Sequence, residues 1–282
     1  MRSSRPKVAV VGHVEWVQFA NVPHVPRAGE VVHARDPFEE PAGGGAVAAV
    51  QLARLAGEAV LITALGEDEL ARRSLVRLGE LGVKVWAAAR PGAETRKAVT
   101  LVDGEGERTI TTFGPRLQPR GDDEQLPWHE LEGMDAVYFT AGDLGALQAA
   151  RTARVLVASP RARDALGHGV ALDALVLSGE DAIERREATR AREEAELVVS
   201  TEGERGGSYR ARTGPSGAWP AASPPADPVD SYGCGDSFAA GLTYGLGAGM
   251  TIPGALALAA RCGAVCLTGR GPYGRQLTGR EL

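Results

Sequence analysis

Short segments rich in Val, Ile and Leu alternate with Ala- and Leu-rich helical segments along most of the chain, and this alternation limits the fold more than any other feature. The first buried strand is expected at 7–12, and an Ala-rich helix follows Gly43-Gly44-Gly45 and stops at Gly57. The pattern continues with a strand at 59–65, a helix at 68–81 and a strand at 83–88. Strands that alternate with helices predict a parallel sheet covered by helices.

The second half of the chain resumes this rhythm. We expect strands, separated by helices, near 136–140, 154–158, 174–177 and 197–200. The charged run 180–196 is typical of a solvated helix face, and a hairpin is expected around 208–211. Two closing helices are expected at 235–246 and 253–267. With no internal repeat and no long linker, residues 1–282 are predicted to form a single domain.

Two stretches interrupt the rhythm and indicate a smaller, separate sheet. Residues 15–38 carry no helical period, and a strand is expected at 30–34. Residues 96–103 and 108–113 flank Gly104-Glu105-Gly106, which is the pattern of a hairpin. We therefore expect accessory strands drawn from about 13–40 and 95–114.

The composition favours a protein that acts on a small molecule in a reducing cell compartment. The net charge of −5 over 282 residues argues against nucleic acid, which needs a basic surface. Three cysteines do not make a disulfide framework, and no apolar run approaches the length of a membrane span. The polar start, Met1 to Lys7, does not resemble a signal peptide, so a cytoplasmic location is expected.

The sequence lacks the commonest nucleotide-binding loops. The only three lysines are Lys7, Lys84 and Lys97, and none follows a glycine, so a Gly-Lys-Ser/Thr phosphate loop is ruled out. The literal Gly-x-Gly-x-x-Gly at 269–274 contains a proline and leaves no room for a βαβ unit after it.

The stretch Asp230-Ser231-Tyr232-Gly233-Cys234-Gly235-Asp236-Ser237-Phe238 reads as a loop that opens a helix. Its glycines let the backbone approach a ligand, and the first N–H groups of a helix attract anions such as phosphate. Asp236 places a carboxylate at this anion site. From spacing alone it is either a general base or an ordinary helix cap.

This stretch resembles the C-terminal signature of the ribokinase-like (PfkB) carbohydrate kinase family, commonly Asp-Thr-x-Gly-Ala-Gly-Asp-x-Phe. The resemblance implies a three-layer α/β fold with a mostly parallel sheet and a small β-sheet lid. It also implies Asp236 as general base and an anion hole made by the amides of Gly233, Cys234 and Gly235. ATP and Mg²⁺ are the implied cofactors, and a monovalent cation near Asp230 stays open.

Weaker matches follow in the family's order. Gly43-Gly44-Gly45 corresponds to a Gly-Gly pair of the substrate site, and Pro26-x-x-Gly29-Glu30 resembles the family's N-terminal region. The stretch 200–207 resembles a Thr-x-Gly-x-x-Gly loop, although alone it reads as a plain strand connection. The resemblance implies that the nucleotide is bordered by Thr201, Gly203, Gly206 and Ser231. Lids of this family often pair between subunits, which implies a homodimer through the lid.

Two positions that differ from the family pattern leave the identity of the substrate undetermined. The positions of the usual sugar-holding Asp and Asn are Val17 and Ala48. Glu15, with Trp16 and Gln18, is expected to shape a different pocket. Arg96, Lys97 or Arg116 would meet an acidic group on the substrate, although such charges are often only solvated.

The family's Asn-x-x-Glu, which organises magnesium through water, is also altered. It reads here as Asp181-Ala182-Ile183-Glu184. Asp181 and Glu184 either hold magnesium through water or are ordinary helix N-terminal acids.

The predicted function is ATP-dependent phosphorylation of a hydroxyl on a small, sugar-like molecule. One alternative is a nucleoside kinase, favoured if Trp16 or Phe19 stacks on a base. Another is a non-catalytic binding or regulatory protein on the same fold, which the changes at Val17 and Ala48 would suit.

Overall fold

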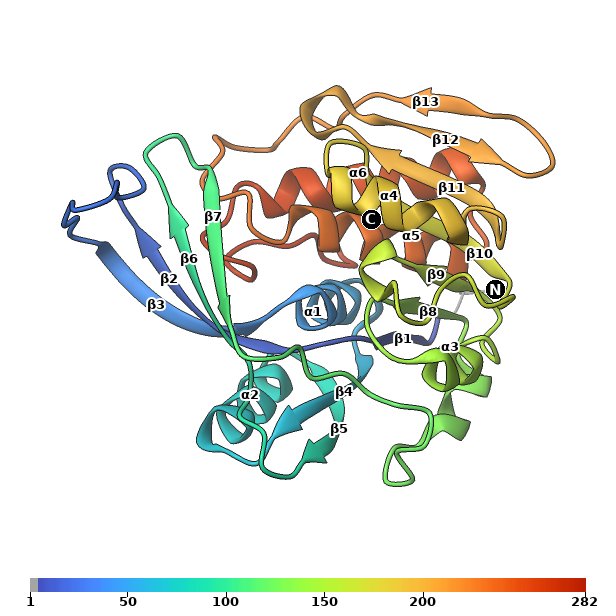
Figure 1. Cartoon of the computed structure of the whole chain (residues 1–282). Helices are drawn as coiled ribbons and strands as arrows, with labels where there is room; N and C mark the ends of the chain where they lie inside the picture. The colour runs from blue at the N-terminus through green and yellow to red at the C-terminus, as the bar shows by residue number, and fades with distance from the viewer. Residues whose placement is uncertain (1–4) are drawn as a thin grey trace.

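The structure is a computed structural model that describes residues 5–282. The first four residues of the predicted domain and of its polar N-terminal segment, Met1 to Ser4, lie outside the described residues. A nine-stranded sheet with the order β13-β12-β11-β10-β9-β8-β1-β4-β5 forms its centre (Figure 1). The seven neighbouring strands from β11 to the β5 edge are parallel to one another. Strands β12 and β13 extend the sheet beyond β11 in antiparallel pairing. The strands are β1 Val8–Val11, β4 Ala59–Gly66, β5 Val83–Arg90, β8 Ala136–Phe139, β9 Leu156–Ala158, β10 Leu172–Ser178, β11 Ala195–Thr201, β12 Gly207–Ala211 and β13 Gly217–Trp219.

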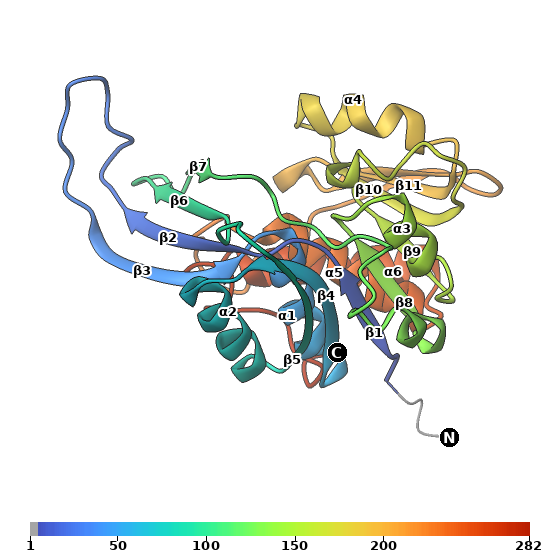
Figure 2. The ribbon, with the colours of Figure 1, turned by 60° about the horizontal axis from the view of Figure 1, so that its bottom comes forward.

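Helices cover both faces of this sheet (Figures 1 and 2). The α-helices are α1 Gly44–Ala56, α2 Glu69–Glu80, α3 Leu144–Ala150, α4 Ala182–Ala191, α5 Cys234–Gly247 and α6 Ile252–Cys266. Side chains alternate between the faces of a strand, so Val8 and Val10 of β1 join one apolar cluster with α1, α5 and α6. Ala9 and Val11 join a second cluster with α3 and α4. The expected three-layer α/β fold is therefore confirmed.

The accessory sheet has four strands in the order β3-β2-β6-β7. Its strands are β2 Glu15–Asn21, β3 Arg35–Ala42, β6 Lys97–Val102 and β7 Arg108–Phe113. Figure 2 shows β2 and β3 as a long ribbon that projects away from the central sheet. Pro37 and Pro41 lie in β3, an edge strand, where a residue without an N–H is tolerated.

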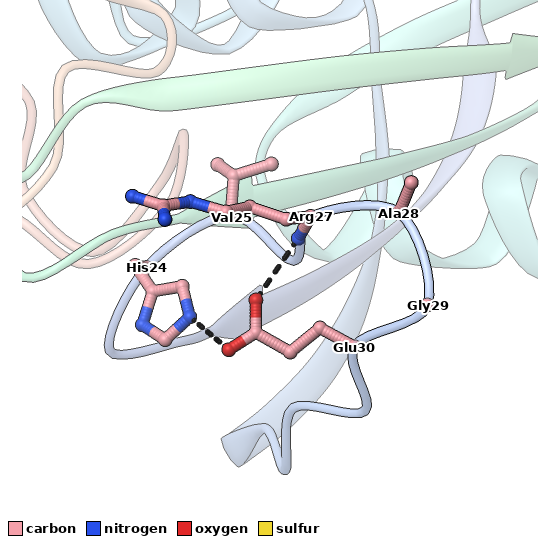
Figure 3. A pocket seen from close by; sticks show the side chains of 6 residues that line it. All are labelled: His24, Val25, Arg27, Ala28, Gly29 and Glu30. Carbon is pink, nitrogen blue, oxygen red and sulfur yellow. Dashed lines mark hydrogen bonds and ion pairs between the residues drawn. The ribbon is translucent and has the colours of Figure 1, made fainter.

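Two details of the sequence prediction were wrong. Residues 30–34 form no strand, because the chain between β2 and β3 is a loop in which Glu30 accepts hydrogen bonds from the Arg27 N–H (3.0 Å) and pairs with His24 (2.7 Å; Figure 3). The strand begins only at Arg35. Between β9 and β10 the described chain has no α-helix either. Pro160 opens only a 3-10 turn, Pro160–Ala162, and Gly167 and Gly169 follow with positive φ.

Among residues 5–282, no helix combines the length and the apolar composition needed to cross a membrane. The three cysteines, Cys234, Cys262 and Cys266, are all free. The cytoplasmic location expected from the sequence stays a prediction.

Helix α1 begins unusually close to the end of β1. The Gly45 N–H donates to the His13 carbonyl oxygen (3.2 Å), and a Cβ at Gly45 would lie 2.6 Å from that oxygen. A Cβ at Gly12 would lie 2.7 Å from the Gly45 Cα. Both positions therefore require glycine, and the contact sets where the helix N-terminus lies relative to the sheet edge.

We expect Gly45→Ala to lower the free energy of unfolding by about 1–3 kcal/mol, because the new methyl group would press against backbone atoms that cannot move aside. Gly79→Ala in α2 is the matched control, since no atom lies within 4 Å of its added Cβ. That control should be neutral, or stabilising by up to ~1 kcal/mol. Urea unfolding of both variants measures the difference, and equal stabilities would refute the close-approach argument.

Candidate active site

The expected substrate glycines and the expected catalytic loop meet at the carboxyl edge of the central sheet. Strand β1 is flanked by β4 on one side and β8 on the other, so connections leave in opposite directions there, and such a point is where α/β sheets bind ligands. A Cβ at Gly44 would lie 3.0 Å from Asp236 Oδ1 and 3.2 Å from Thr140 Oγ1. The start of α1, the end of β8 and the first turn of α5 therefore surround one small space.

The opening of α5 presents backbone amides to this space. Gly233 is its N-cap in the left-handed region (φ 85°), and a Cβ there would lie 2.9 Å from Val47 Cγ1. The first helical hydrogen bond runs from the Ser237 N–H to the Gly233 carbonyl (2.8 Å). The Cys234 N–H makes only a long bond to Ser231 (3.4 Å), and Gly235 is exposed. The helix opening can therefore receive an anion.

Asp236 lies in the first turn of α5, and its side chain is 14% exposed. Its Oδ1 lies 3.4 Å from Arg161 Nη1, and its carboxylate makes no cap hydrogen bond to the described α5 backbone. Burial raises the pKa of Asp236 above the ordinary value of aspartic acid, and the Arg161 charge opposes that rise. A buried carboxylate of raised basicity beside an open anion site has the properties of a general base.

Arg161 is a site residue that the sequence reasoning missed. It lies in the turn after β9 and joins Asp236 to Glu184, whose Oε1 accepts from Arg161 Nε at 2.8 Å. The Asp236 carboxylate raises the pKa of Arg161, so the guanidinium stays charged. The available signal was its position directly after an expected parallel strand, at the edge where ligands bind.

Asp181 and Glu184 lie at the start of α4. Asp181 is the N-cap, because its Oδ1 accepts from the N–H groups of Ile183 (2.8 Å) and Glu184 (3.1 Å). Both oxygens of Glu184 accept hydrogen bonds, from Arg161 and from the Ser178 N–H. The Asp181 Oδ2 atom has no hydrogen bond among the described residues. Carboxylates engaged in this way suit Mg²⁺ held through water and do not form a direct ligand cage.

The substrate side is built around Glu15 and Arg96. Glu15 Oε2 lies 3.4 Å from Arg96 Nε, and a Cβ at Gly43 would lie 3.3 Å from the Glu15 side chain and 3.0 Å from His13 Nε2. Burial raises the pKa of Glu15 and lowers that of His13. The Gly43 N–H also donates to the Tyr232 hydroxyl (3.4 Å), which ties this side to the loop before α5.

Several other expected pocket residues lie elsewhere. Trp16 donates to Glu39 and carries Arg73 over its ring, Gln18 also bonds Glu39, and Lys97 pairs with Glu94. Phe19 is 1% exposed and packs against Phe38 and Tyr232. Neither Trp16 nor Phe19 therefore offers a free ring face to a base in this structure. Val17 and Ala48 are fully buried in the apolar core.

The loop expected to border the nucleotide lies beside α5. Thr201 ends β11, and Gly203 opens a short 3-10 turn, Gly203–Arg205. A Cβ at Gly206 would lie 2.1 Å from the Trp219 carbonyl oxygen, which requires glycine there. The Trp219 ring in turn stacks on Phe238 of α5 (centroids 5.6 Å apart). The loop and the helix opening therefore share one edge of the sheet.

Ser231 and Asp230 make structural contacts. The Ser231 hydroxyl accepts from Arg108 Nη1 (3.0 Å) at the start of β7, so the accessory hairpin touches the loop before α5. The two carboxylate oxygens of Asp230 accept from the N–H groups of Tyr232 (2.8 Å) and Gly271 (2.9 Å). These bonds hold the loop in place, and a cation at Asp230 stays a prediction.

We expect the Asp236 carboxyl to titrate above the ordinary range of aspartic acid, and Arg161→Gln to move its pKa higher still by removing the nearby cation. Because the folded protein then holds the proton more tightly than the unfolded chain, this group lowers stability as pH rises from its ordinary pKa to the raised one. Carbon-13 NMR of labelled Asp measures the titration. Arg163→Gln, two residues from Arg161, is the control, and an identical shift in both variants would contradict the pairing.

Known proteins similar to this chain are kinases of one family. The model of the pfkB family carbohydrate kinases matches residues 5–175 and 171–277. Fructokinase from Klebsiella pneumoniae is 29% identical over 272 residues, covering 82% of this chain and 87% of that protein. The bifunctional protein HldE from Alkalilimnicola ehrlichii is 32% identical over 251 residues, covering 81% of this chain and 52% of its own length. The chain thus spans only about half of that relative.

Solved structures agree on the fold. A putative ribokinase from Agrobacterium tumefaciens has a TM-score of 0.80 at 20% identity, covering 98% of this chain and 95% of that one. Arabidopsis thaliana ribokinase, solved with ribose and ATP, has a TM-score of 0.76 at 17% identity, covering 98% and 97%. These structures confirm the ribokinase-like fold. The family model and the fructokinase match confirm the expected enzyme class, a phosphotransferase with an alcohol group as acceptor. The chain belongs to the pfkB family of carbohydrate kinases.

Proposed function

We propose that the protein transfers the γ-phosphoryl group of ATP to a hydroxyl of a small, sugar-like molecule. The observation that carries this proposal is the placement of Asp236 between the glycine-lined start of α1 and the open amides of α5. An acceptor hydroxyl in this space would lie within reach of a base and of an anion site at once. The alternative reading of Asp236 as a helix cap has no supporting hydrogen bond among the described residues.

In the proposed mechanism Asp236 accepts the hydroxyl proton as the oxygen attacks the phosphorus in line. The amides of Gly233, Cys234 and Gly235 hold the charge of the transferring group, with the dipole of α5 behind them. The Arg161 charge favours the ionised form of Asp236 and so opposes the rise in its pKa. Mg²⁺, when bound through water near Asp181 and Glu184, would neutralise charge on the phosphates of ATP.

The accessory sheet would act as a lid. Its hairpin β6–β7 already touches the catalytic loop through Arg108 and Ser231, and Ser231 Oγ also lies 3.4 Å from the Gly106 carbonyl. Closure of the lid over the acceptor would exclude water, which would otherwise take the phosphoryl group. Thr201, Gly203 and Gly206 are the residues we assign to the nucleotide border.

We expect Asp236→Asn to lower turnover by about 10²–10⁴-fold, because the hydroxyl loses its proton acceptor. The change is nearly isosteric, so the fold and nucleotide affinity should persist. ADP release over a panel of sugars, polyols, sugar acids and nucleosides, with calorimetric titration of ATP, measures both quantities. Full activity of the variant would sink the mechanism, and a wild-type protein that binds ATP but phosphorylates nothing would favour the non-catalytic alternative.

We also propose that two copies pair through the lid. All six residues of β7 are exposed and β7 is an edge strand, with Ile110 42% and Phe113 51% exposed. An uncovered edge strand with apolar side chains is a ready surface for a second chain.

Light scattering should therefore give twice the mass of one chain, and Ile110→Lys should shift the protein toward monomer, because a buried unpaired charge disfavours the interface. Val76→Lys changes an apolar residue on α2 that is also exposed, at 52%, and should leave the dimer intact. A wild-type monomer at micromolar concentration would contradict the pairing.

A further inference from the structure

A cavity of about 490 Å³ opens beside the proposed base and is lined by four arginines, Arg96, Arg116, Arg161 and Arg163. Arg161 is the link to the chemistry, since it also contacts Asp236. Through Arg161, the cavity therefore lies next to the place where we put the acceptor hydroxyl. The arginines that line the cavity indicate which charged group the acceptor carries besides its hydroxyl.

Two of these arginines are brought together by the register of the lid hairpin. Lys97 pairs with Phe113, so the two chain ends of β6 and β7 meet at the base of the hairpin. Arg96 directly precedes this pair, and Arg116 follows it by three residues. The hairpin thus sets both guanidinium groups on the lid side of the cavity.

The acidic residues that line the same cavity already have partners. Glu184 bonds Arg161 (2.8 Å), Glu187 bonds Arg186 (2.9 Å), and Asp181 caps α4. Asp164 lies 3.8 Å from Arg163. On the lid side, Arg96 lies 3.4 Å from Glu15, so among the four arginines only Arg116 has no carboxylate oxygen within 4.0 Å in the described residues.

Arg116 stands out among the four. Its Nη2 donates to the Arg161 carbonyl oxygen (2.9 Å), but within residues 5–282 no carboxylate oxygen lies within 4.0 Å of its guanidinium. Burial lowers the pKa of Arg116, and the neighbouring Arg96 lowers it further. A partly buried cation beside other cations is unfavourable unless an anion joins it.

Buried polar atoms around this group also lack partners. Nδ1 of His13 and Oγ1 of Thr140 make no hydrogen bond among the described residues, and Glu15 Oε2 and Arg96 Nε have only each other, 3.4 Å apart. His13 is 7% exposed, Glu15 6% and Thr140 0%. Unsatisfied buried polar atoms are rare in folded proteins, and here they gather where a polar ligand would complete them.

We propose that the phosphoryl acceptor is itself an anion, whose carboxylate or phosphate group binds between Arg96 and Arg116 while its hydroxyl lies at Asp236. This inference rests on the proposed kinase function. Guanidinium groups fit both anions because their parallel N–H groups match paired oxygens. His13 and Glu15 would bond the remaining hydroxyls. The nucleotide is not the expected occupant, because Arg96 and Arg116 belong to the lid side of the site.

The test compares, on each of two carbon skeletons, a neutral sugar, a carboxylate and a phosphate ester. ADP release is measured with D-glucose, D-gluconate and D-glucose 6-phosphate, and with D-ribose, D-ribonate and D-ribose 5-phosphate. We expect an acidic member to be the better acceptor, and the comparison of carboxylate with phosphate identifies the anion. In Arg116→Gln the KM for that acceptor should rise about 10- to 100-fold, with the KM for ATP unchanged.

Two variants separate recognition from structure. Arg116→Lys keeps the charge but loses the paired N–H groups, so its KM should lie between those of the wild type and Arg116→Gln. Arg72→Gln removes an arginine of α2 whose partner is Glu69 and should behave as the wild type. A neutral sugar or nucleoside as the best acceptor, with no effect of Arg116→Gln, would overturn the inference and leave the kinase function standing.

If no acceptor is phosphorylated, that result counts against the proposed function. A binding measurement then tests the anion site by itself. With the nucleotide site filled by a non-hydrolysable ATP analogue, the melting temperature is measured with inorganic phosphate and with succinate. A rise in the wild type that is lost in Arg116→Gln supports the anion site. The same rise in both proteins, or none in either, refutes it.

Discussion

The whole site depends on a close backbone contact that only glycine residues permit. Helix α1 starts against the end of β1, with the Gly45 N–H on the His13 carbonyl and no room for a Cβ at Gly12 or Gly45. This contact brings Gly44 up to Asp236 and Thr140 and places the start of α1 opposite the start of α5. A side chain at Gly44 would enter the space where we place the acceptor hydroxyl, and one at Gly12 or Gly45 would force α1 away from β1. The glycines are therefore spatial requirements of the site and not general sources of flexibility.

Charge balance is the second constraint. A buried carboxylate such as Asp236 is costly unless a cation stands near it, and Arg161 meets this need while also binding Glu184. One guanidinium thus connects the proposed base to the acids at the start of α4. The lid side of the cavity shows the opposite imbalance, since Arg116 has no carboxylate partner among the described residues. A site that is satisfied at the base and unsatisfied toward the lid is arranged for an anionic ligand on the lid side.

Sequence patterns predicted elements well where the signals were local. The helix 44–56 begins within the glycine run and stops at Gly57 with φ 100°, and the hairpin around 104–106 has Gly106 at φ 82°, as the turn chemistry required. They failed where local preference and packing disagreed. Residues 30–34 are β-prone, but the expected pairing was taken instead by 35–42 beside β2. The missing helix between β9 and β10 was an extrapolation of the βα rhythm across Pro160 and two glycines.

The sequence by itself determined the family, the layered fold and the character of the loop before α5, because a glycine in the left-handed region, a helix start and a first-turn carboxylate are all local features of 230–238. Only the tertiary structure decided which charges surround that carboxylate. Arg161 lies 75 residues from Asp236 in the chain, and Arg96 and Arg116 reach the cavity from the two ends of the lid hairpin. No local pattern marks such residues, since arginine is most often a solvated surface residue. Their meeting follows from which strand ends converge at one edge of the sheet, and strand order is a property of the folded chain alone.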